Sequence, residues 1–163
     1  KIFVRNGDMN PHAEVLSGMS FNRALEHIRN SVRAPLFVVV TAALRFSKQW
    51  LKQLADISAA IGPEAKIITP TIDGENSGHR DDYAFQKSSR GVWRTHRGSY
   101  HEMPATAQAC SVMNWSCLFM LDDLSPSNWR EWLTGLNQHG VRTFCADDTL
   151  VGLLPSLNSV SDV

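Results

Sequence analysis

The apolar positions of this chain form short continuous runs that alternate with stretches of helical periodicity. The clearest run is Leu36 to Val40, which ends in three consecutive valines and contains no polar residue. A strand without polar alternation is typical of a sheet that is covered on both faces. Further runs predict strands at Ile2 to Arg5, Lys66 to Pro70, Cys110 to Leu121 and Val141 to Cys145.

Three segments between these runs repeat apolar residues every three or four positions, as helices with one buried face do. The first is predicted to be capped by Ser20, with Phe21, Leu25 and Ile28 on its inner face. The second is predicted to begin at Ser47 and end at Gly62-Pro63, and the third to begin at Ser125-Pro126 and end at Gly140. The expected stripes are Trp50, Leu51, Leu54, Ile57 and Ile61 in the second helix and Trp129, Trp132, Leu133 and Leu136 in the third.

This order of segments predicts an α/β fold: a three-layer sandwich with a mainly parallel sheet and a long polar insertion. Strand, helix and strand in succession favour a right-handed crossover between parallel strands. Two such units would lay Val38 and Phe144 side by side in one covered sheet. With 163 residues, we expect a single domain over residues 1–155, a long loop or lid at 71–105 that includes short strands such as Gly91 to Arg94, and a frayed tail at 156–163.

The charges and the cysteines exclude several classes of partner. The 16 basic and 16 acidic residues cancel, so no overall field attracts nucleic acid, and we expect no nucleic-acid partner. No run approaches the roughly 20 apolar residues of a membrane span, so we expect a soluble domain. Cys110, Cys117 and Cys145 lack the spacing of a metal site and lie in apolar segments, which predicts buried free thiols and a reducing, cytoplasmic location.

Two adjacent carboxylates follow the last predicted strand. Paired carboxylates at the end of a strand can raise the pKa of one of them and so create a general base. Asp147 and Asp148 are therefore the candidate catalytic residues. The alternative is a solvated turn in which an aspartate caps the following segment.

The polar segment 71–105 carries candidate ligands for a metal or an anion. His79, His96 and His101 occur there with Asp73, Asp81 and Asp82. Histidine and carboxylate bind zinc, but no pair has the one-turn spacing of a helical site, so we predict no metal site.

The same segment interleaves Arg90, Arg94 and Arg97 with Trp93, a pattern that could bind a phosphate or stack on a base. Arg94 and Arg97 cannot share one face of a strand, because their separation is odd. Diffuse surface basicity is therefore the alternative.

The stretch from Ala34 to Met120 resembles glycosyltransferases of the GT-A fold, most closely the polypeptide N-acetylgalactosaminyltransferases. In those enzymes a buried strand leads to a metal-binding Asp-x-His or Asp-x-Asp, and a helix then opens near a Trp-Leu pair, here Trp50-Leu51. A strand ending in Pro-x-Ile-Asp follows, here Pro70 to Asp73. Later matches in the family's order are Asp82-Tyr83-Ala84-Phe85, Gly91-Val92-Trp93, Pro104 and Ser116-Cys117-Leu118-Phe119.

This resemblance implies a nucleotide-sugar as ligand and an acidic residue after the last strand, which Asp147 or Asp148 would supply. It also implies a substrate site at Asp73, Trp93, Arg94, Arg97 and Ser116. The metal motif falls on Thr41-Ala42-Ala43, which offers neither carboxylate nor imidazole, so a divalent cofactor is unsupported. The domain is then either an active glycosyltransferase or a remnant that kept the scaffold and lost catalysis.

Two segments, Leu36 to Thr71 and Cys110 to Phe144, also resemble bacterial cell-division inhibitors that have a RecA-like core and no nucleotide loop. That resemblance implies a non-catalytic module that binds a protein partner. A subunit of a larger assembly is the third alternative.

Overall fold

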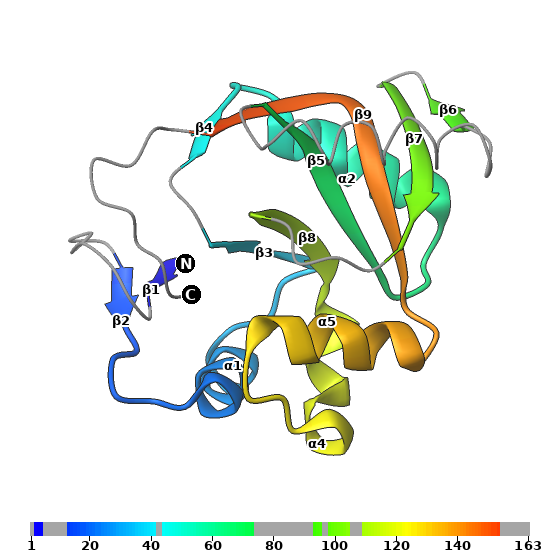
Figure 1. Ribbon diagram of the computed structural model, residues 1–163. Coiled ribbons are helices and arrows are strands. Elements are labelled where there is room, and N and C mark those ends of the chain that lie inside the picture. Colours follow the sequence, from blue (N-terminus) through cyan, green and yellow to red (C-terminus); the bar gives the residue numbers. More distant parts are fainter. Residues whose placement is uncertain are drawn as a thin grey trace.

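The computed structural model describes residues 2–4, 13–41, 44–73, 93–95, 98–104 and 109–153. Most strands within these ranges belong to one sheet, and β1 and β2 form a separate parallel pair (Figure 1). In chain order the elements are β1 (Ile2–Val4), β2 (Ala13–Val15), α1 (Phe21–Ser31), β3 (Leu36–Val40), β4 (Leu44–Phe46), α2 (Trp50–Ile61), β5 (Lys66–Asp73), β6 (Trp93–Thr95), β7 (Gly98–Met103), β8 (Cys110–Asn114), the 3-10 helix η1 (Trp115–Met120), α4 (Leu121–Leu124), α5 (Trp129–Gln138) and β9 (Arg142–Leu153).

The main sheet has the strand order β3-β8-β5-β9-β7-β6, and β4 pairs with the C-terminal part of β9. Among the described strands of this sheet, β5 and β9 are the one parallel pair, and the other neighbours are antiparallel. The mainly parallel sheet expected from the sequence is therefore not confirmed. The reason is β8, which follows β5 in the chain but inserts between β3 and β5 in the opposite direction.

Strands β3, β5 and β9 nevertheless run in one direction, because β8 is antiparallel to both β3 and β5, and β9 is parallel to β5. Val38 pairs with Val112 of β8, and Phe144 pairs with Ile68 of β5. The two segments expected to lie side by side are thus in the same sheet, but β8 and β5 separate them.

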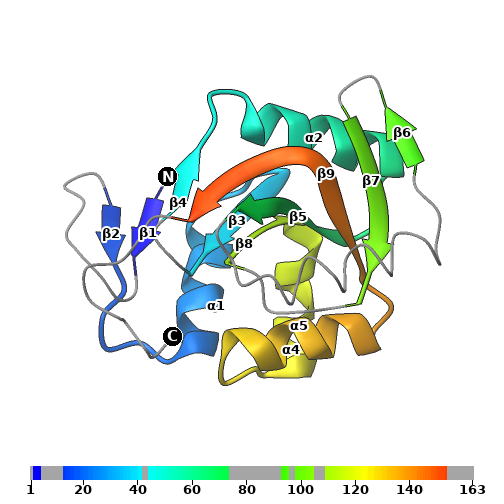
Figure 2. The same cartoon turned by 45° about the horizontal axis from the view of Figure 1, so that its top comes forward.

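Helices cover both faces of this sheet (Figure 2). On one face α1, η1, α4 and α5 pack around Trp132, and on the other α2 packs around Leu54. Consecutive residues of a strand enter different cores: Ile67 belongs to the first cluster and Ile68 to the second. Burial on both faces explains why the strand segments show no polar alternation.

The first helix begins as expected, because Ser20 Oγ accepts a hydrogen bond from the backbone N–H of Arg23 at 3.3 Å. The second begins at Trp50 rather than Ser47, whose carbonyl accepts the Trp50 N–H at 3.3 Å. Its stripe is correct except for Leu51, which is 44 % exposed. Position 51 is one residue away from the face that Trp50 shares with residues 54, 57 and 61.

The third expected helix begins later than predicted, at Trp129 rather than at Ser125-Pro126. Ser125 ends α4 with a φ of 41°, so the chain cannot continue as a helix from there. Asn128 starts α5 instead, and its side chain accepts a hydrogen bond from the Glu131 N–H at 2.9 Å. The predicted inner face is correct: Trp129, Trp132, Leu133 and Leu136 are all buried.

The strand expected from Cys110 to Leu121 is correct only in its first part. β8 ends at Asn114, and the chain continues as η1. Cys117 and Leu118 are fully buried in this helix. An apolar run without periodicity does not distinguish a buried strand from a buried helix.

The polar segment 71–105 contains the end of β5 and the β6–β7 hairpin. The strand expected at Gly91 to Arg94 overlaps β6. Residues 74–92 and the expected tail at 156–163 lie outside the described ranges. Among the helices that the structure describes, none combines the length and apolar character needed to cross a membrane.

Candidate functional site

The acidic pair lies inside β9 rather than after a strand. β9 continues to Leu153, and its pairing with β5 shifts register: Pro70 pairs with Ala146, and Thr71 pairs with Leu150. β9 thus inserts residues 147–149 between two consecutive positions of β5. Such a bulge bends a strand and redirects its side chains. The expected strand end at Cys145 and the alternative of a solvated turn are both corrected by this geometry.

Two residues of β7, His101 and Ser99, contact the carboxylate of Asp147. Its Oδ1 lies 2.8 Å from Nδ1 of His101, and its Oδ2 accepts a hydrogen bond from Ser99 Oγ at 3.4 Å. The side chain of His101 is 1 % exposed and that of Asp147 is 9 % exposed. Breaking a polar contact at such low exposure would leave desolvated groups without partners. Both side chains are therefore fixed relative to each other.

Asp148 is exposed, but it is also anchored to β7. Its Oδ2 accepts hydrogen bonds from the N–H of Ser99 at 2.8 Å and from the Ser99 hydroxyl at 3.1 Å. Gly98 makes this approach possible: a Cβ at that position would lie 3.2 Å from both Cβ and Oδ2 of Asp148. The site thus presents one carboxylate to solvent in a defined position.

A row of polar side chains crosses the sheet beside this pair, on the face opposite α2. His101 pairs with Cys145, which in turn pairs with Thr69. The Thr69 hydroxyl donates to the carbonyl oxygen of Cys110 at 2.9 Å. The nearby Thr143 hydroxyl is buried and has no hydrogen-bond partner within the described part of the chain. This region is therefore a polar interior rather than a continuation of the apolar core.

Three potential metal ligands meet in this row. His101, Cys145 and Asp147 each offer one ligand atom, and the three atoms lie within 4.8 Å of one another. Thr71 supports them from β5, because its Oγ1 lies 3.8 Å from Cys145 Sγ and donates to the carbonyl oxygen of Ala146 at 3.1 Å. The cluster offers a thiol, an imidazole and a carboxylate to a small ion.

Asp73, Trp93 and Arg94, expected in the substrate site, lie on β5, which pairs with β9, and on β6, which β7 separates from β9. Asp73 is the last residue of β5, beyond the bulge. Trp93 and Arg94 lie in β6, where Arg94 is in register with Ser99. The structure thus brings β6 beside the residue that contacts both aspartates. Arg97 lies outside the described ranges.

Ser116, the remaining candidate of the substrate site, lies at the opposite end of the sheet. The end of β8 meets the start of β5, where the Asn114 side chain accepts the Lys66 N–H at 3.0 Å. Ser116 follows in η1 and is exposed. The structure therefore does not bring Ser116 to the acidic pair.

In glycosyltransferases of the GT-A fold a divalent cation binds just after the buried strand. The residues at that position of this chain, Thr41-Ala42-Ala43, do not suit a cation. Thr41 follows β3 and donates its N–H to the carbonyl oxygen of Ala109 at 2.9 Å. Its hydroxyl is a weak substitute for a carboxylate, and the next two residues are alanines. Oxygen-rich, charged ligand sets are what such cations require.

Sequence reasoning alone does not find the partners of Asp147. By sequence, His101 groups with the carboxylates of the polar segment, and Cys145 counts only as a buried thiol. The available signal is the alternation of residues 98–103, which is compatible with a strand that carries Ser99 and His101 on one face. Which strand lies opposite is decided by pairing with β9, more than forty positions along the chain.

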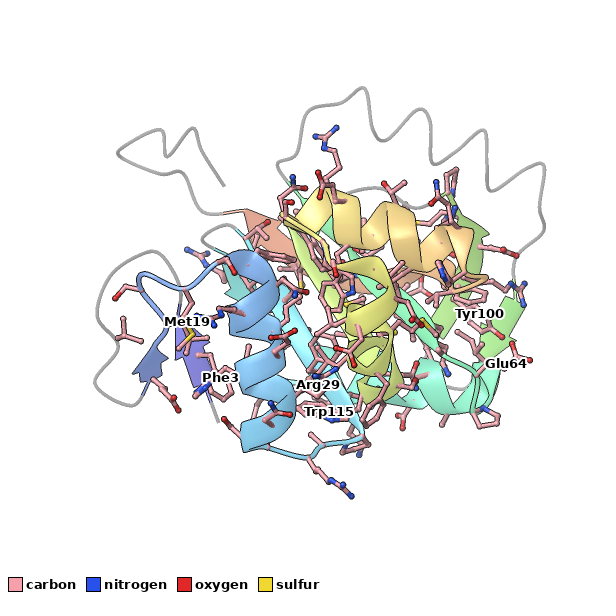
Figure 3. All side chains as sticks on the ribbon, turned by 90° about the horizontal axis from the view of Figure 1, so that it is seen from below. Phe3, Met19, Arg29, Glu64, Tyr100 and Trp115 are labelled. Atoms are coloured by element: carbon pink, nitrogen blue, oxygen red, sulfur yellow. The ribbon has the colours of Figure 1, made fainter. Side chains whose placement is uncertain are left out.

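A second surface feature is an open hollow of about 440 Å³ between the α1–β3 loop and η1. It is lined by Arg33, Ala34, Pro35, Trp115 and Phe119. Phe119 is 61 % exposed, and an adjoining hollow extends to Arg29. Figure 3 shows Arg29 and Trp115 close together and well separated from Tyr100 of β7.

No protein-family model matches this chain, and no curated protein is significantly similar to it.

Proposed function

We propose that this chain is a GT-A-like, glycosyltransferase-related domain that binds a nucleotide-sugar at the sheet end carrying the acidic pair. The observation that carries the proposal is the common direction of β3, β5 and β9, together with a bulge in β9 that presents Asp148 level with the carboxyl end of β3. In open α/β sheets, ligands bind beyond the carboxyl ends of strands that run in the same direction.

The carboxyl end of β3 lies level with the bulge of β9, and β5 and β9 continue beyond it to Asp73 and Leu153. Thr41, directly after β3, bonds to Ala109, and the next residue, Cys110, bonds through its carbonyl to Thr69 of β5. The bulge of β9 begins one position further, opposite Pro70. Three strand spacings of about 4.8 Å separate β3 from β9. An extended ligand such as a nucleotide-sugar suits a site of that width.

The two aspartates take different roles in this proposal. Asp148 is exposed and held by Ser99, so it is the carboxylate that contacts the ligand. Asp147 is buried against His101 and acts as a positioning residue that shapes the bulge. If transfer occurs, Asp148 is the general base.

The diphosphate of the ligand needs a positive charge beside it. Thr41-Ala42-Ala43 cannot provide this charge, because these residues do not bind a metal ion. Arg94 in β6 and Arg97, three residues further along the sequence, are the candidates, since guanidinium groups bind phosphate oxygens in bidentate fashion. We therefore expect binding that does not depend on manganese, without turnover of the sugar.

Calorimetric titration of the chain with UDP- and GDP-sugars, with and without manganese, tests this function. Binding of at least one nucleotide-sugar in both conditions is the expected result. Asp148→Asn should weaken it about 10- to 100-fold, because a hydrogen bond to a charged group contributes about 1.5–3 kcal/mol. Asp123→Asn, an exposed carboxylate of α4, is the matched control. Absence of binding to all the sugars, or equal effects of the two variants, contradicts the proposal.

A non-catalytic interaction module is the second candidate, and the hollow beside η1 favours it. Exposed Phe119 next to Trp115 offers an apolar contact, and the exposed Arg33 beside them adds positive charge. The fitting partner is a protein segment that carries an apolar side chain next to a carboxylate. Phe119→Ser should abolish co-purification of such a partner, whereas Leu51→Ser, at an exposed position of α2, should not. Equal recovery with both variants argues against this surface.

A reducing, cytoplasmic compartment fits this chain under either function. Cys110, Cys117 and Cys145 are free and buried, as the sequence predicts. Burial raises the pKa of Cys110 and Cys117 to about 12, so both remain protonated thiols at neutral pH. Alkylation in lysed cells under denaturing conditions should find all three cysteines reduced. Recovery of a disulfide contradicts this location.

A further inference from the structure

The sheet geometry places a thiol, an imidazole and a carboxylate on one buried face. Cys145 in β9 is in register with His101 in β7, so their side chains project to the same side. Asp147 lies two residues beyond Cys145 and projects to that side as well, which its 2.8 Å contact with His101 Nδ1 demonstrates. The antiparallel pairing of two strands is enough to assemble this cluster.

The three groups form a ligand set that suits zinc. Zinc binds cysteine sulfur, histidine nitrogen and aspartate oxygen, most often in tetrahedral sites. A thiolate and a carboxylate together neutralise a divalent ion, so the occupied site carries no net charge into the interior. The ligand atoms already lie within 4.8 Å of one another, and small side-chain rotations suffice to bring them around one ion.

The burial of this cluster favours metal binding and argues against a catalytic role for Cys145. Cys145 is 3 % exposed and His101 is 1 % exposed. A cysteine nucleophile has to meet an acyl or glycosyl carbon, and this burial leaves no access for such a group. An ion has only to reach three ligand atoms that already lie within 4.8 Å of one another.

The surroundings supply the outer contacts that metal ligands need. Ser99 donates to the Asp147 carboxylate, and Thr71 contacts the Cys145 sulfur. Thr143 and Ser111, on the same face of the sheet, have buried hydroxyls with no hydrogen-bond partner in the described ranges. Outer hydrogen bonds of this type orient ligands and tune metal affinity.

We propose that His101, Cys145 and Asp147 bind one zinc ion, with water as the fourth ligand. This ion would pin β7 to the bulge of β9 and so fix the position of Asp148. The site is separate from Thr41-Ala42-Ala43, and it differs from the expectation, drawn from sequence spacing, that the histidines hold no metal.

Metal titration of the metal-free full chain tests the site directly. We expect one zinc ion per chain by equilibrium dialysis with elemental analysis. Cobalt added to the metal-free chain should produce a thiolate-to-cobalt charge-transfer absorption, and zinc should then displace the cobalt and abolish it. Cys145→Ala should remove that absorption, whereas Cys110→Ala, an equally buried cysteine outside the cluster, should retain it.

A graded series separates metal binding from the hydrogen bond between His101 and Asp147. Ser99→Ala removes an outer contact and should weaken zinc binding roughly 10- to 100-fold. Asp147→Asn keeps the side-chain shape but loses a charged ligand, so it should weaken binding more. Zinc should raise the melting temperature of the wild type and of Cys110→Ala, but not of Cys145→Ala.

Far-UV circular dichroism of each variant establishes that it is folded before the metal is added. Failure of the folded wild type to bind zinc or cobalt overturns the proposal and leaves the cluster as a structural contact between His101 and Asp147. Unchanged affinity in Asp147→Asn or Cys145→Ala overturns it as well.

Discussion

At the scale of single residues, Lys66 has the most unusual position for a charge. It is 2 % exposed, and its ammonium group donates to the backbone carbonyls of Gly62 and, at 3.0 Å, Glu64. Desolvation by burial lowers the pKa of Lys66 below its ordinary value of 10.5, although nearby Glu64 partly opposes this. The charge is therefore held at the end of α2 at some cost in stability.

This burial predicts a pH dependence of stability. Between the lowered pKa of folded Lys66 and 10.5, the unfolded chain binds more protons than the folded one, so folding stability rises with pH across that window. Lys66→Met lacks this contribution. The free energy of unfolding of the wild type, minus that of Lys66→Met, should therefore increase from neutral pH towards 10.5 in urea denaturation experiments. Lys52→Met, at an exposed position of α2, is the control for the substitution itself. A flat difference for Lys66→Met contradicts the prediction.

Gly98 is a second residue with a specific physical requirement. Its φ of +136° is a conformation that side chains rarely adopt, and a Cβ would press against Asp148. Gly98→Ala should therefore lower the free energy of unfolding by roughly 1–3 kcal/mol. Gly152→Ala in β9 is the control, because its Cβ would meet Arg45 at an ordinary 3.7 Å. Equal losses in the two variants, measured by urea denaturation, would show that Gly98 has no special role.

At the scale of elements, the start of α5 depends on local hydrogen bonds. Asn128 accepts the N–H of Glu131, and the Glu131 carboxylate accepts the N–H of Ser127 at 2.8 Å. These contacts satisfy donors that the first turn of a helix leaves open. The helix then carries four buried residues of the larger core.

Removal of this cap has a predictable cost. Asn128→Ala should lower the free energy of unfolding by about 1 kcal/mol, and Asn128→Asp should restore most of it. Asn137→Ala, an exposed position near the other end of α5, should change stability by less than about 0.5 kcal/mol. Thermal denaturation followed by circular dichroism measures all three. A loss with Asn137→Ala as large as that with Asn128→Ala would exclude the cap as the cause.

At the scale of the whole molecule, β5 links the two cores. It lies between β8 and β9, and Ile67 and Ile68 belong to different clusters. We expect its amides to exchange most slowly with deuterium, because they are released only when both helical layers separate from the sheet. The amides of β6 and of the β1–β2 pair should exchange much faster. Native-state exchange with mass spectrometry measures this, and rates in β5 as fast as those in β6 contradict the prediction.

The two candidate surfaces lie at opposite ends of the molecule. The acidic pair lies in the bulge of β9, towards the end of the sheet where β3 finishes, and the hollow with Phe119 is at the end where β8 leads into η1. Substitutions at Asp148 and Phe119 should therefore act independently, because sites without shared contacts are usually additive. The functions proposed for the two surfaces can be tested one at a time.

The sequence by itself determined the local features of this protein. The packing of Leu36 to Val39 against cores on both faces, the inner faces of α1 and α5, the Ser20 cap and the three buried free thiols follow from residue type and spacing. Val40 is an exception, because it is 45 % exposed at the end of an edge strand. The ends of the helices and strands are harder to predict from the sequence. For example, the apolar run after Cys110 does not reveal that β8 gives way to η1 at Trp115. An apolar run without periodicity is compatible with either a strand or a helix, so the pattern does not distinguish them.

Only the tertiary structure decided the strand order and the candidate site. Insertion of β8 between β3 and β5 is a pairing between segments far apart in the chain, and no local propensity encodes it. The same holds for His101, Cys145 and Asp147, which become neighbours only because β7 pairs with β9 next to a bulge. Hydrogen bonding between backbones is nearly independent of side-chain identity, so the choice of partner strand depends on how the two helical layers pack against the sheet.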